Sequence, residues 1–492
     1  MNEALAAPAE SGGKWLEWPW ILAFSTVWGL VLVVLASVET RYAAALAVGL
    51  VIFTVPLFLE NKRMYFLSLM TLTLFLGNNK MIASVTNIWP HDPIERMTVN
   101  ITDVLLAASC AVWFFSSIGA KTRPAPRGRN LLLPMGCLIL SVLFSFVNST
   151  YPILGVFELV RMAKALLLYW FLIHNIRSRE EVRLLVALLA FNIFVQFAIT
   201  LLQKYGGSTL GLSYFGEVQT VMESMMGADI VFRAGGTLGH PNHLAYCLDL
   251  LIPLMFSMSF SSALSGGRRA YFTLAFGAAC VCLYLTLSRG GFVGTGVAMA
   301  LAAALIVRRN LRQDQFAVKT AATLLAILIA AGVAALPLYN RFIKDDAGAF
   351  KTRVYQWRVA YNIIEAHPWV GVGLNNYRNV APAYDDTPVR ISTSFTYPVH
   401  NVYLLAFAET GIVGLLGLLA LLIAALNKAY FGRWPYGEPY DLHLGFFFGF
   451  LAYIIHTNVD INPPGSYVFF YFLLGLLTAA HRLEAQTLGA SQ

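Results

Sequence analysis

The chain has 492 residues, of which 58% are hydrophobic and 12% charged, with a mean hydropathy of +0.64 and a formal net charge of +8. An average soluble domain carries about 25% charged residues, so this composition excludes a soluble globular protein and indicates repeated membrane crossings. The basic residues lie between apolar runs rather than in a soluble domain, which excludes a nucleic-acid-binding module.

Fourteen apolar runs qualify as candidate membrane spans, since a spanning helix needs about 20 mostly apolar residues. In chain order they are 20–38, 42–59, 64–76, 101–120, 131–147, 154–176, 184–202, 241–260, 270–288, 290–307, 317–336, 401–426, 442–459 and 467–480. The runs 64–76 and 467–480 are short, so we expect twelve to fourteen spans. The sequence predicts an all-α polytopic membrane protein with one integral membrane domain, 20–480, and cytoplasmic tails at 1–19 and 481–492.

Basic segments between the runs set the predicted orientation. When the spans alternate, the compact Lys and Arg clusters fall on one side, which the positive-inside rule assigns to the cytoplasm: 62–63, 121–129, 177–183, 268–269, 308–312 and 428–433. The long loop 338–399 then lies outside, although it holds seven Lys or Arg, because long loops cross the membrane regardless of charge. A large cationic loop on that side points to an anionic substrate.

Two basic residues, Arg161 and Lys164, lie one helical turn apart near the outer end of the run 154–176. Ionisable residues at membrane depth usually face protein or a water-filled cavity, so both are candidate ligands for an anion. Glu158 lies three residues before Arg161, and a local ion pair is the alternative.

A glycine-rich turn, Arg233-Ala-Gly-Gly-Thr-Leu-Gly-His-Pro-Asn242, leads into the run 241–260. Pro241 suits the first helical position because its missing N–H is not needed there. The free N–H groups and the positive dipole end of that helix would face outward beside Arg233 and Asn242, an arrangement that binds anions. The alternative is a purely structural turn with a helix cap.

The segment Ser288-Arg289-Gly290-Gly291 joins two apolar runs with almost no loop. Arg289 should therefore sit at or just below the outer surface, where it can meet an anionic group in a protein-lined cavity. The alternative is that its side chain extends to the membrane interface.

The long loop contains a predicted helix over 353–366, with apolar residues at helical spacing on one face: Val354, Trp357, Tyr361 and Ile364. His367-Pro368 ends this helix, and Gly371-Val372-Gly373 follows as a turn. We expect the helix to lie along the membrane surface with its apolar face down.

The long loop ends at His400, at the start of the run 401–426. Histidine is the natural general base near neutral pH, and the predicted topology places it on the same face as the glycine-rich turn and Arg289. A structural histidine at the interface is the alternative.

Two His/Asp pairs, His456 with Asp460 and His91 with Asp92, lack a third ligand, so no metal or other cofactor is predicted. The sequence contains no nucleotide-binding loop and no nucleophile elbow. Any donor should therefore arrive already activated.

These motifs together resemble the bacterial O-antigen ligase/polymerase superfamily (the WaaL and Wzy type). The resemblance rests on Arg233…Gly239-His-Pro-Asn242-His-Leu-Ala245, on Ser288-Arg289-Gly290, and on Trp357…His367-Pro-Trp-Val-Gly371-Val-Gly373 leading to His400-Asn-Val-Tyr-Leu404…Glu409-Thr-Gly411-Ile-Val-Gly414. It covers about 233–417 in detail and the whole chain in topology. The family's glycine turn often has Asn where this chain has His240.

The resemblance implies a GT-C-like, metal-independent, inverting glycosyltransferase of the bacterial inner membrane, with a polyprenyl-diphosphate-linked oligosaccharide as donor and its active site facing the periplasm. His400 would take the proton of the acceptor hydroxyl, and Arg289 would stabilise the leaving group. The diphosphate would be held by further residues: Arg233, Pro241, Asn242, Arg353, Arg358, Arg161 and Lys164. Trp357, Trp369 and Tyr397 would stack on sugars, with membrane-interface anchoring as the alternative.

The leading hypothesis is a polymerase that joins repeat units of an exopolysaccharide or O-antigen. One alternative is a ligase that transfers finished glycan to lipid A-core or protein. Another is a secondary transporter, although a transporter should carry polar or broken helices at the bilayer midplane. Expected partners are the lipid-linked donor, a glycan acceptor and membrane lipid, with a flippase and a chain-length regulator as further candidates and no nucleic acid.

Overall fold

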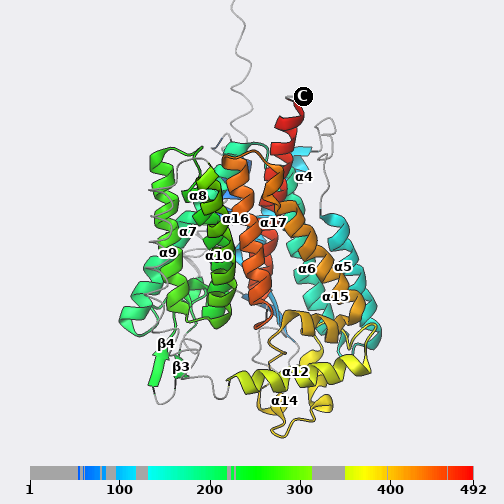
Figure 1. Ribbon diagram of the computed structural model, residues 1–492. Helices are drawn as coiled ribbons and strands as arrows, with labels where there is room; N and C mark the ends of the chain where they lie inside the picture. The colour runs from blue at the N-terminus through cyan, green and yellow to red at the C-terminus, as the bar shows by residue number, and fades with distance from the viewer. Residues whose placement is uncertain are drawn as a thin grey trace, which may run out of the picture. The chain divides into compact units, whose positions relative to one another are not determined.

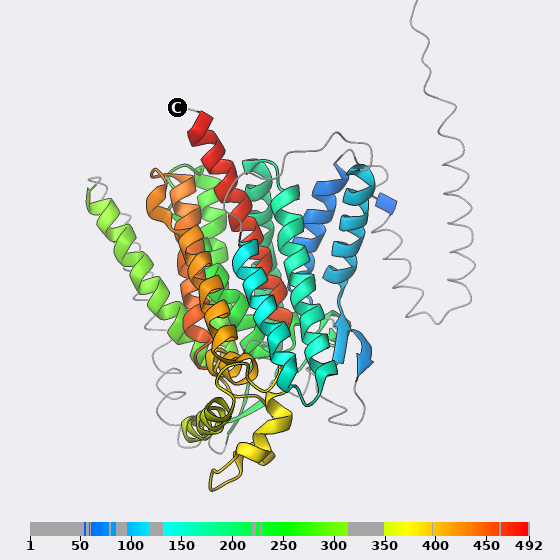
Figure 2. The same ribbon diagram turned by 90° about the vertical axis from the view of Figure 1, so that its right-hand side faces the viewer.

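The structure is a computed structural model that describes residues 61–77, 80–84, 96–117, 131–218, 223–226, 229–312, 349–395, 397–461 and 464–490, with the isolated positions 54, 55 and 59 (Figures 1 and 2). The chain divides into two compact units, residues 1–65 and 66–492. The predicted spans 20–38 and 317–336, nearly all of 42–59, and the first part of the long loop lie outside the described residues.

The described elements are almost all helices. The longer ones are α3 (Lys62–Thr73), α4 (Ile101–Ser117), α5 (Leu132–Ser145), α6 (Pro152–Asn175), α7 (Arg179–Gly206), α8 (Pro241–Ser259), α9 (Gly266–Thr286), α10 (Arg289–Arg312), α12 (Ala349–Ala366), α15 (Val402–Ala429), α16 (Glu438–His456) and α17 (Pro464–Ala490). Short α-helices and 3₁₀ turns complete them: α13 (Tyr377–Val380), α14 (Ile391–Ser394), η3 (Phe146–Asn148), η4 (Ser213–Phe215), η5 (Gly236–Leu238), η7 (Ala381–Tyr384) and η8 (Phe431–Arg433).

Two small antiparallel hairpins are the described strands: β1 (Lys80–Ser84) with β2 (Arg96–Val99), and β3 (Glu223–Met226) with β4 (Asp229–Phe232). Five described helical segments are long and apolar enough to cross a membrane: Arg179–Gly206, Gly266–Thr286, Arg289–Arg309, Val402–Arg433 and Val468–Thr487. The predicted all-α polytopic membrane fold is confirmed, while the number of spans stays a prediction.

Helix α16 packs closely on α8 and α10 because glycines lie at both helix–helix contacts. A Cβ on Gly449 would lie 2.5 Å from the carbonyl oxygen of Leu250 in α8, and one on Gly294 would lie 2.5 Å from that of Ala452 in α16. Small residues allow such backbone approach between membrane helices. The three helices therefore form a dense core, which holds the ends of α8 and α10 in register with α16.

The two ends of α16 carry different chemistry. At its N-terminal end, Glu438 pairs with Arg183 of α7, and Asp441 pairs with Arg309 of α10 at 2.5 Å. These arginines belong to clusters that the sequence assigns to the cytoplasm. At its C-terminal end lie His456 and, just beyond it, Asp460. The predicted cytoplasmic clusters thus meet at one end of the bundle, and the candidate site forms at the other.

The end of the long loop folds against α15. Figure 1 places α12 and α14 beyond the end of the helix bundle that is opposite the C-terminal end of α17. The predicted helix 353–366 is confirmed as α12, which begins four residues earlier. Its buried face is formed by Val359, Ala360 and Ile363, whereas Val354 and Tyr361 are exposed. This face is set by packing onto α15 and the short helices of the loop.

Two glycine turns, at Gly371 in the loop and at Gly411 inside α15, cross and pack against each other's neighbouring backbone. Gly371 has φ of +69° and a Cβ there would meet the backbone of Glu409, while Gly411 has φ of +67° and faces the backbone of Trp369. The amide of Val372 donates to Ala408 O at 3.0 Å, and that of Gly373 donates to Glu409 O at 2.9 Å. Because only glycine enters this conformation at little cost, the two turns hold the loop against the kink at Gly411 inside α15.

Candidate active site

The centre of the site is a His/Asp pair. His400 Nδ1 lies 2.9 Å from Asp460 Oδ1, and the two side chains are 22% and 6% exposed. His400 Nε2 is buried and has no hydrogen-bond partner among the described residues. A carboxylate on Nδ1 fixes the tautomer that carries its proton there and leaves Nε2 as an acceptor. This is the arrangement of a general base held in orientation by an acid.

Asp460 links this pair to the glycine-rich turn. Its Oδ2 accepts a hydrogen bond from Asn242 Nδ2, and Asn242 Oδ1 in turn accepts one from Arg233 Nη2 at 2.7 Å. Burial raises the pKa of the Asp460 carboxyl, but the hydrogen bond and charge of His400 outweigh it and hold that pKa well below its ordinary value. Asp460 is therefore an anion that connects His400 to Arg233 through one amide.

The turn before α8 is shaped by η5 and its flanking glycines. Gly236 and Gly239 have φ of +58° and +78°, and a Cβ on Gly239 would lie 2.8 Å from Gly216 O. Pro241 is the first residue of α8, as predicted, and His240 is its N-cap, whose Nδ1 accepts from the Asn242 amide at 3.0 Å. The side chain of His240 thus accepts from one of the free backbone N–H groups at the helix start, which the sequence analysis assigned to an anion.

His240 acts as a neutral hydrogen-bond acceptor because its surroundings disfavour a positive charge on its imidazole. Burial, with the charges of His243, Arg233 and His400, lowers the pKa of His240 to about 3 against the opposing effect of Asp460. A neutral imidazole at the N-cap can accept the backbone N–H, as Ser or Asn does at such positions. His240 therefore has a capping role that its position in the motif did not reveal.

Two predicted arginines flank the short turn between α9 and α10. Arg233 Nε donates to Thr286 O, the last residue of α9, at 2.9 Å. Arg289 is the first residue of α10 and is half-buried. The turn between them contains Leu287 with φ of +51° and Ser288, which bonds back to Thr286 Oγ1. The Arg233 guanidinium is thus anchored to one tight turn, and Arg289 follows directly after that turn.

A second, fully buried His/Asp pair lies beneath this turn. His456 Nδ1 lies 2.5 Å from Asp249 Oδ2, and Thr295 donates to Asp249 Oδ1 at 2.7 Å. The ring of Tyr246 stacks on His456 with centroids 4.0 Å apart, and a Cβ on Gly290 would collide with the same imidazole. His456 and Asp460 thus face different carboxyl and imidazole partners rather than a shared metal. The pair supports the residue that follows Arg289.

The other predicted cations have local partners instead. Arg161 Nη1 lies 2.5 Å from Glu158, and Lys164 Nζ lies 2.6 Å from Asp103. Arg358 pairs with the exposed Asp386, and its hydrogen bond holds the pKa of that carboxyl below its ordinary value. Arg353 is half-buried on α12.

The three predicted sugar-binding aromatics differ in exposure. Trp369 is 72% exposed and Tyr397 is 53% exposed, whereas Trp357 is half-buried in the loop core. Tyr397 contacts Phe395 with ring centroids 5.3 Å apart, and Phe395 contacts His400 at 5.4 Å. Of the three, Tyr397 is the one that a described chain of contacts connects to His400.

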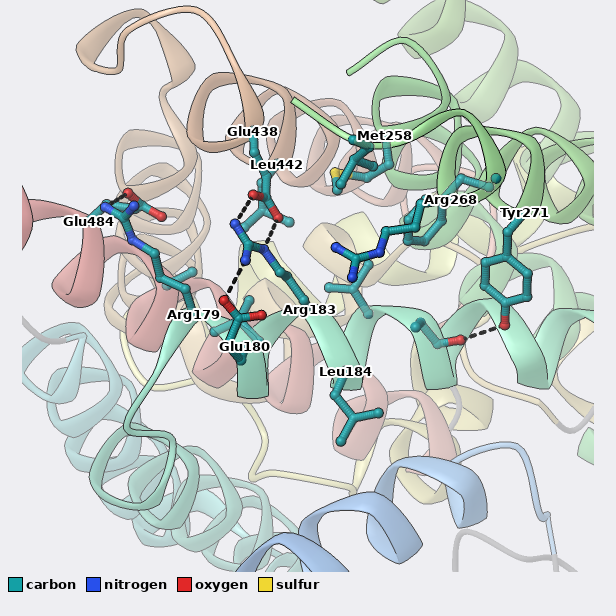
Figure 3. Close-up of a pocket in the computed structure, with 17 residues that line it drawn as sticks. Arg179, Glu180, Arg183, Leu184, Met258, Arg268, Tyr271, Glu438, Leu442 and Glu484 are labelled. Carbon is teal, nitrogen blue, oxygen red and sulfur yellow. Dashed lines mark hydrogen bonds and ion pairs between the residues drawn. The ribbon is translucent and has the colours of Figure 1, made fainter. Parts of the chain in front are cut away.

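A cavity lies at the other end of the bundle, away from His400 and Asp460 (Figure 3). It has a volume of about 390 Å³ and is lined by the N-terminal turns of α7, α9 and α16 and the C-terminal part of α17. Arg183 pairs there with Glu180 and Glu438, and Arg179 pairs with Glu484. It is far along α16 from His456 and Asp460, so size alone does not make it the reaction site.

Sequence reasoning missed Asp460 as the partner of His400. The spacing of His456 and Asp460 drew attention to both residues, but only as a weak metal pair. Sixty residues separate His400 from Asp460, and no local periodicity reports a contact of that range. The outward placement of both at helix ends was the available signal.

Comparison with known protein families gives a match in the second half of the chain. Residues 274–419 match the profile of the Wzy_C family, described as O-Antigen ligase. The matched region contains Arg289, α12, the crossing of the two glycine turns and His400. No curated protein matches the chain.

Proposed function

We propose that this chain, whose residues 274–419 match the O-antigen ligase family, is a glycosyltransferase of the O-antigen ligase/polymerase superfamily. It transfers a glycan from a polyprenyl diphosphate to a hydroxyl of an acceptor sugar at the periplasmic face of the inner membrane. The acceptor is the next lipid-linked repeat unit, so the product is a growing polysaccharide. The observation that carries the proposal is the connection His400–Asp460–Asn242–Arg233.

His400 supplies the base. Its unpartnered Nε2 takes the proton of the acceptor hydroxyl as the oxygen attacks the anomeric carbon. Asp460 stabilises the imidazolium that forms and keeps the ring oriented. The attack on the face opposite the leaving diphosphate inverts the configuration. The proton then leaves from His400, which is 22% exposed.

Arg233 and Arg289 hold the leaving group. Guanidinium groups bind phosphate oxygens with two parallel hydrogen bonds and stabilise charge that develops as the glycosidic bond breaks. Arg233 is anchored to the turn between α9 and α10, and Asn242 connects it to the base through Asp460. Arg289 begins α10 directly after the same turn. Arg161, Lys164, Arg353 and Arg358 stay predictions with less support, because three of them pair with a carboxylate.

A ligase is the second candidate, and the description of the matched family favours it. It would use the same base and the same diphosphate site, with lipid A-core or a protein as the acceptor in place of a lipid-linked repeat unit. The chemistry at His400 does not depend on which acceptor arrives.

A gene deletion with glycan analysis tests the proposal and separates the two candidates. Loss of the polymerase leaves single repeat units on their usual acceptor, whereas loss of a ligase leaves long polymer on the polyprenyl carrier. Complementation with wild type should restore the glycan, and complementation with His400→Ala or Arg289→Ala should not, at equal membrane abundance. Unchanged glycan in the deletion strain would rule out the proposed reaction.

A further inference from the structure

A buried amide in the long loop has no structural use that the described residues reveal. Gln356 of α12 is 5% exposed, yet neither its Nε2 nor its Oε1 has a hydrogen-bond partner among them. Its backbone carbonyl accepts a hydrogen bond from Tyr377, which leaves the side chain alone unused. Burying an amide without partners is costly. A ligand group that satisfies it would explain why it is there.

Gln356 lines a small recess in the loop. Arg378 and Ser392 also line it, together with the rings of Phe395 and Tyr397 at one side. Its volume of about 10 Å³ is close to the least that holds one water-sized group. The recess can therefore take one hydroxyl or a similar arm of a larger molecule, but not a whole sugar ring.

Two lining residues of the recess connect it to His400 by ring contacts. Tyr397 is 53% exposed, and its ring contacts Phe395, whose ring in turn contacts His400 with centroids 5.4 Å apart. A sugar ring that places one hydroxyl in the recess would lie across exposed aromatic surface one side chain away from His400. Aromatic faces bind the apolar faces of sugars, and an amide can both donate to and accept from a hydroxyl.

We infer that the recess formed by Gln356, Ser392, Phe395 and Tyr397 is a subsite for the acceptor sugar, which it binds by one hydroxyl-bearing arm. The inference rests on the proposed function, because it takes His400 as the base. It deepens that function by assigning a place to the acceptor.

The acceptor, rather than the donor diphosphate, belongs at this recess. His400 contacts the anionic Asp460 and, through Asn242, the arginine that binds phosphate in the proposed reaction. The contact with Phe395 is a separate one and joins His400 to a surface of aromatic and neutral polar groups. The base thus stands between a cationic group and a sugar-binding surface, as transfer to a hydroxyl requires.

The substitution Gln356→Met separates binding from folding. Methionine fills nearly the same volume without the unsatisfied amide, so the melting temperature of the purified full-length protein should stay level or rise. The KM for the acceptor should rise roughly tenfold or more, since a buried hydrogen bond to a hydroxyl is lost. The KM for the lipid-linked donor and kcat should change less than about twofold, because the substitution removes only binding to the acceptor. Tyr397→Ala should raise the acceptor KM in the same way.

Gln203→Met is the matched control for stability. Gln203 is also fully buried, but its amide is satisfied by Glu217 and by both backbone groups of Gly236. The same substitution should there lower the melting temperature. An unchanged acceptor KM in Gln356→Met would show that the recess holds only water, and a lower melting temperature would show that the amide has a structural partner. Either result would overturn the inference.

A binding measurement distinguishes this inference from the proposed function. Saturation-transfer NMR measures contact between simple glycosides and the full chain or its Gln356→Met variant. The glycosides are methyl α-glucoside, methyl α-galactoside, methyl α-mannoside and methyl β-N-acetylglucosaminide. Binding that depends on Gln356, without glycan transfer by wild type, would keep the sugar site and reject the transferase. If wild type transfers glycan, but sugar binding and the acceptor KM do not depend on Gln356, the transferase is kept and the sugar site is rejected.

Discussion

At the scale of single residues, the site is a chain of polar contacts that converts one histidine into an oriented base. His400 alone at a helix start has many structural explanations. Its buried partner Asp460, which is itself held by Asn242, restricts the imidazole to one tautomer. The same amide fixes Arg233, so in the proposed reaction proton removal and phosphate binding are coupled through one carboxylate and one amide.

The substitution Asp460→Asn tests that coupling. The amide keeps the size of the side chain but loses the charge that stabilises the protonated His400, so kcat should fall by about 10²–10⁴-fold. The measurement is the initial rate of glycan transfer across pH, with membrane abundance and melting temperature as controls. A rate within about threefold of wild type would remove Asp460 from the mechanism.

His240 predicts a specific pH dependence of stability. Its pKa is lowered to about 3 in the fold, from about 6.5 in the unfolded chain. The unfolded state therefore binds more protons below about pH 6.5, and stability falls as the pH drops toward 3 but is unaffected above that window. Between pH 7 and pH 5 the loss from this group should be about 2 kcal/mol.

Replacing His240 with Asn isolates this contribution. Asparagine is a good N-cap and does not titrate, so the decrease in melting temperature from pH 7 to pH 5 should be smaller in His240→Asn than in wild type. Thermal unfolding in lipid nanodiscs at the two pH values gives the comparison. Equal decreases in both proteins would show that His240 is not the buried neutral group described.

At the scale of elements, helix ends and glycines decide where the charged groups meet. The starts of α8, α10 and α15 and the end of α16 all present residues to one region. Glycines in α10 and α16 permit the close packing that holds those ends in place. The second His/Asp pair, His456 with Asp249, lies directly against Gly290 and thus supports the first turn of α10.

Two glycines of α10 offer a paired test of that packing. Gly290→Ala would collide with His456 and should lower stability by about 1–3 kcal/mol, with a further loss of activity because Arg289 is displaced. Gly296→Ala meets nothing within 4 Å and should be neutral or stabilising by up to about 1 kcal/mol. Melting temperature and transfer rate of both variants check this. Equal behaviour of the two would contradict the described contact between α10 and α16.

At the scale of the whole molecule, the two ends of the helix bundle have separate chemistry. One end gathers ion pairs between arginines of the predicted cytoplasmic clusters and acidic residues of α16 and α17. The other end gathers His400, Asp460, Arg233 and Arg289, with the end of the long loop folded beside them. Transfer from a lipid-linked donor needs such a site at a membrane surface, where both the lipid and a water-soluble glycan can reach it.

Cysteine labelling tests the predicted sidedness. Thr393→Cys, in the exposed loop helix α14, should react with a membrane-impermeant maleimide in intact spheroplasts. Arg268→Cys, at the exposed start of α9, should react only after permeabilisation. The background is a variant whose five native cysteines are replaced. The opposite labelling pattern would place His400 in the cytoplasm and refute the proposed use of a periplasmic donor.

Local sequence signals predicted most of the described helices, whereas the roles of the individual site residues stay predictions. Apolar runs and Pro241 predicted α8, and the start of α15 was predicted to follow His400 directly. The helical spacing in the long loop predicted α12, although its buried face is the one that packs onto α15 rather than the one with Val354 and Tyr361. The partnerships of the charged residues were not predictable, because the sequence left the alternatives for Arg161 and His400 open.

The sequence by itself determined that this protein is an all-α membrane protein and that His400 and Arg289 lie at helix boundaries, and it predicted that the basic clusters share one side. Hydrophobic length, charge asymmetry and the chemistry of Gly and Pro act locally, so they can be read from neighbouring residues. Tertiary structure alone decided that Asp460 holds His400, that Asp249 holds His456, and that Gln356 is buried without a partner. The two His/Asp contacts join residues 60 and 207 positions apart, and the burial of Gln356 depends on how α12 packs against other elements. Helix packing decides both.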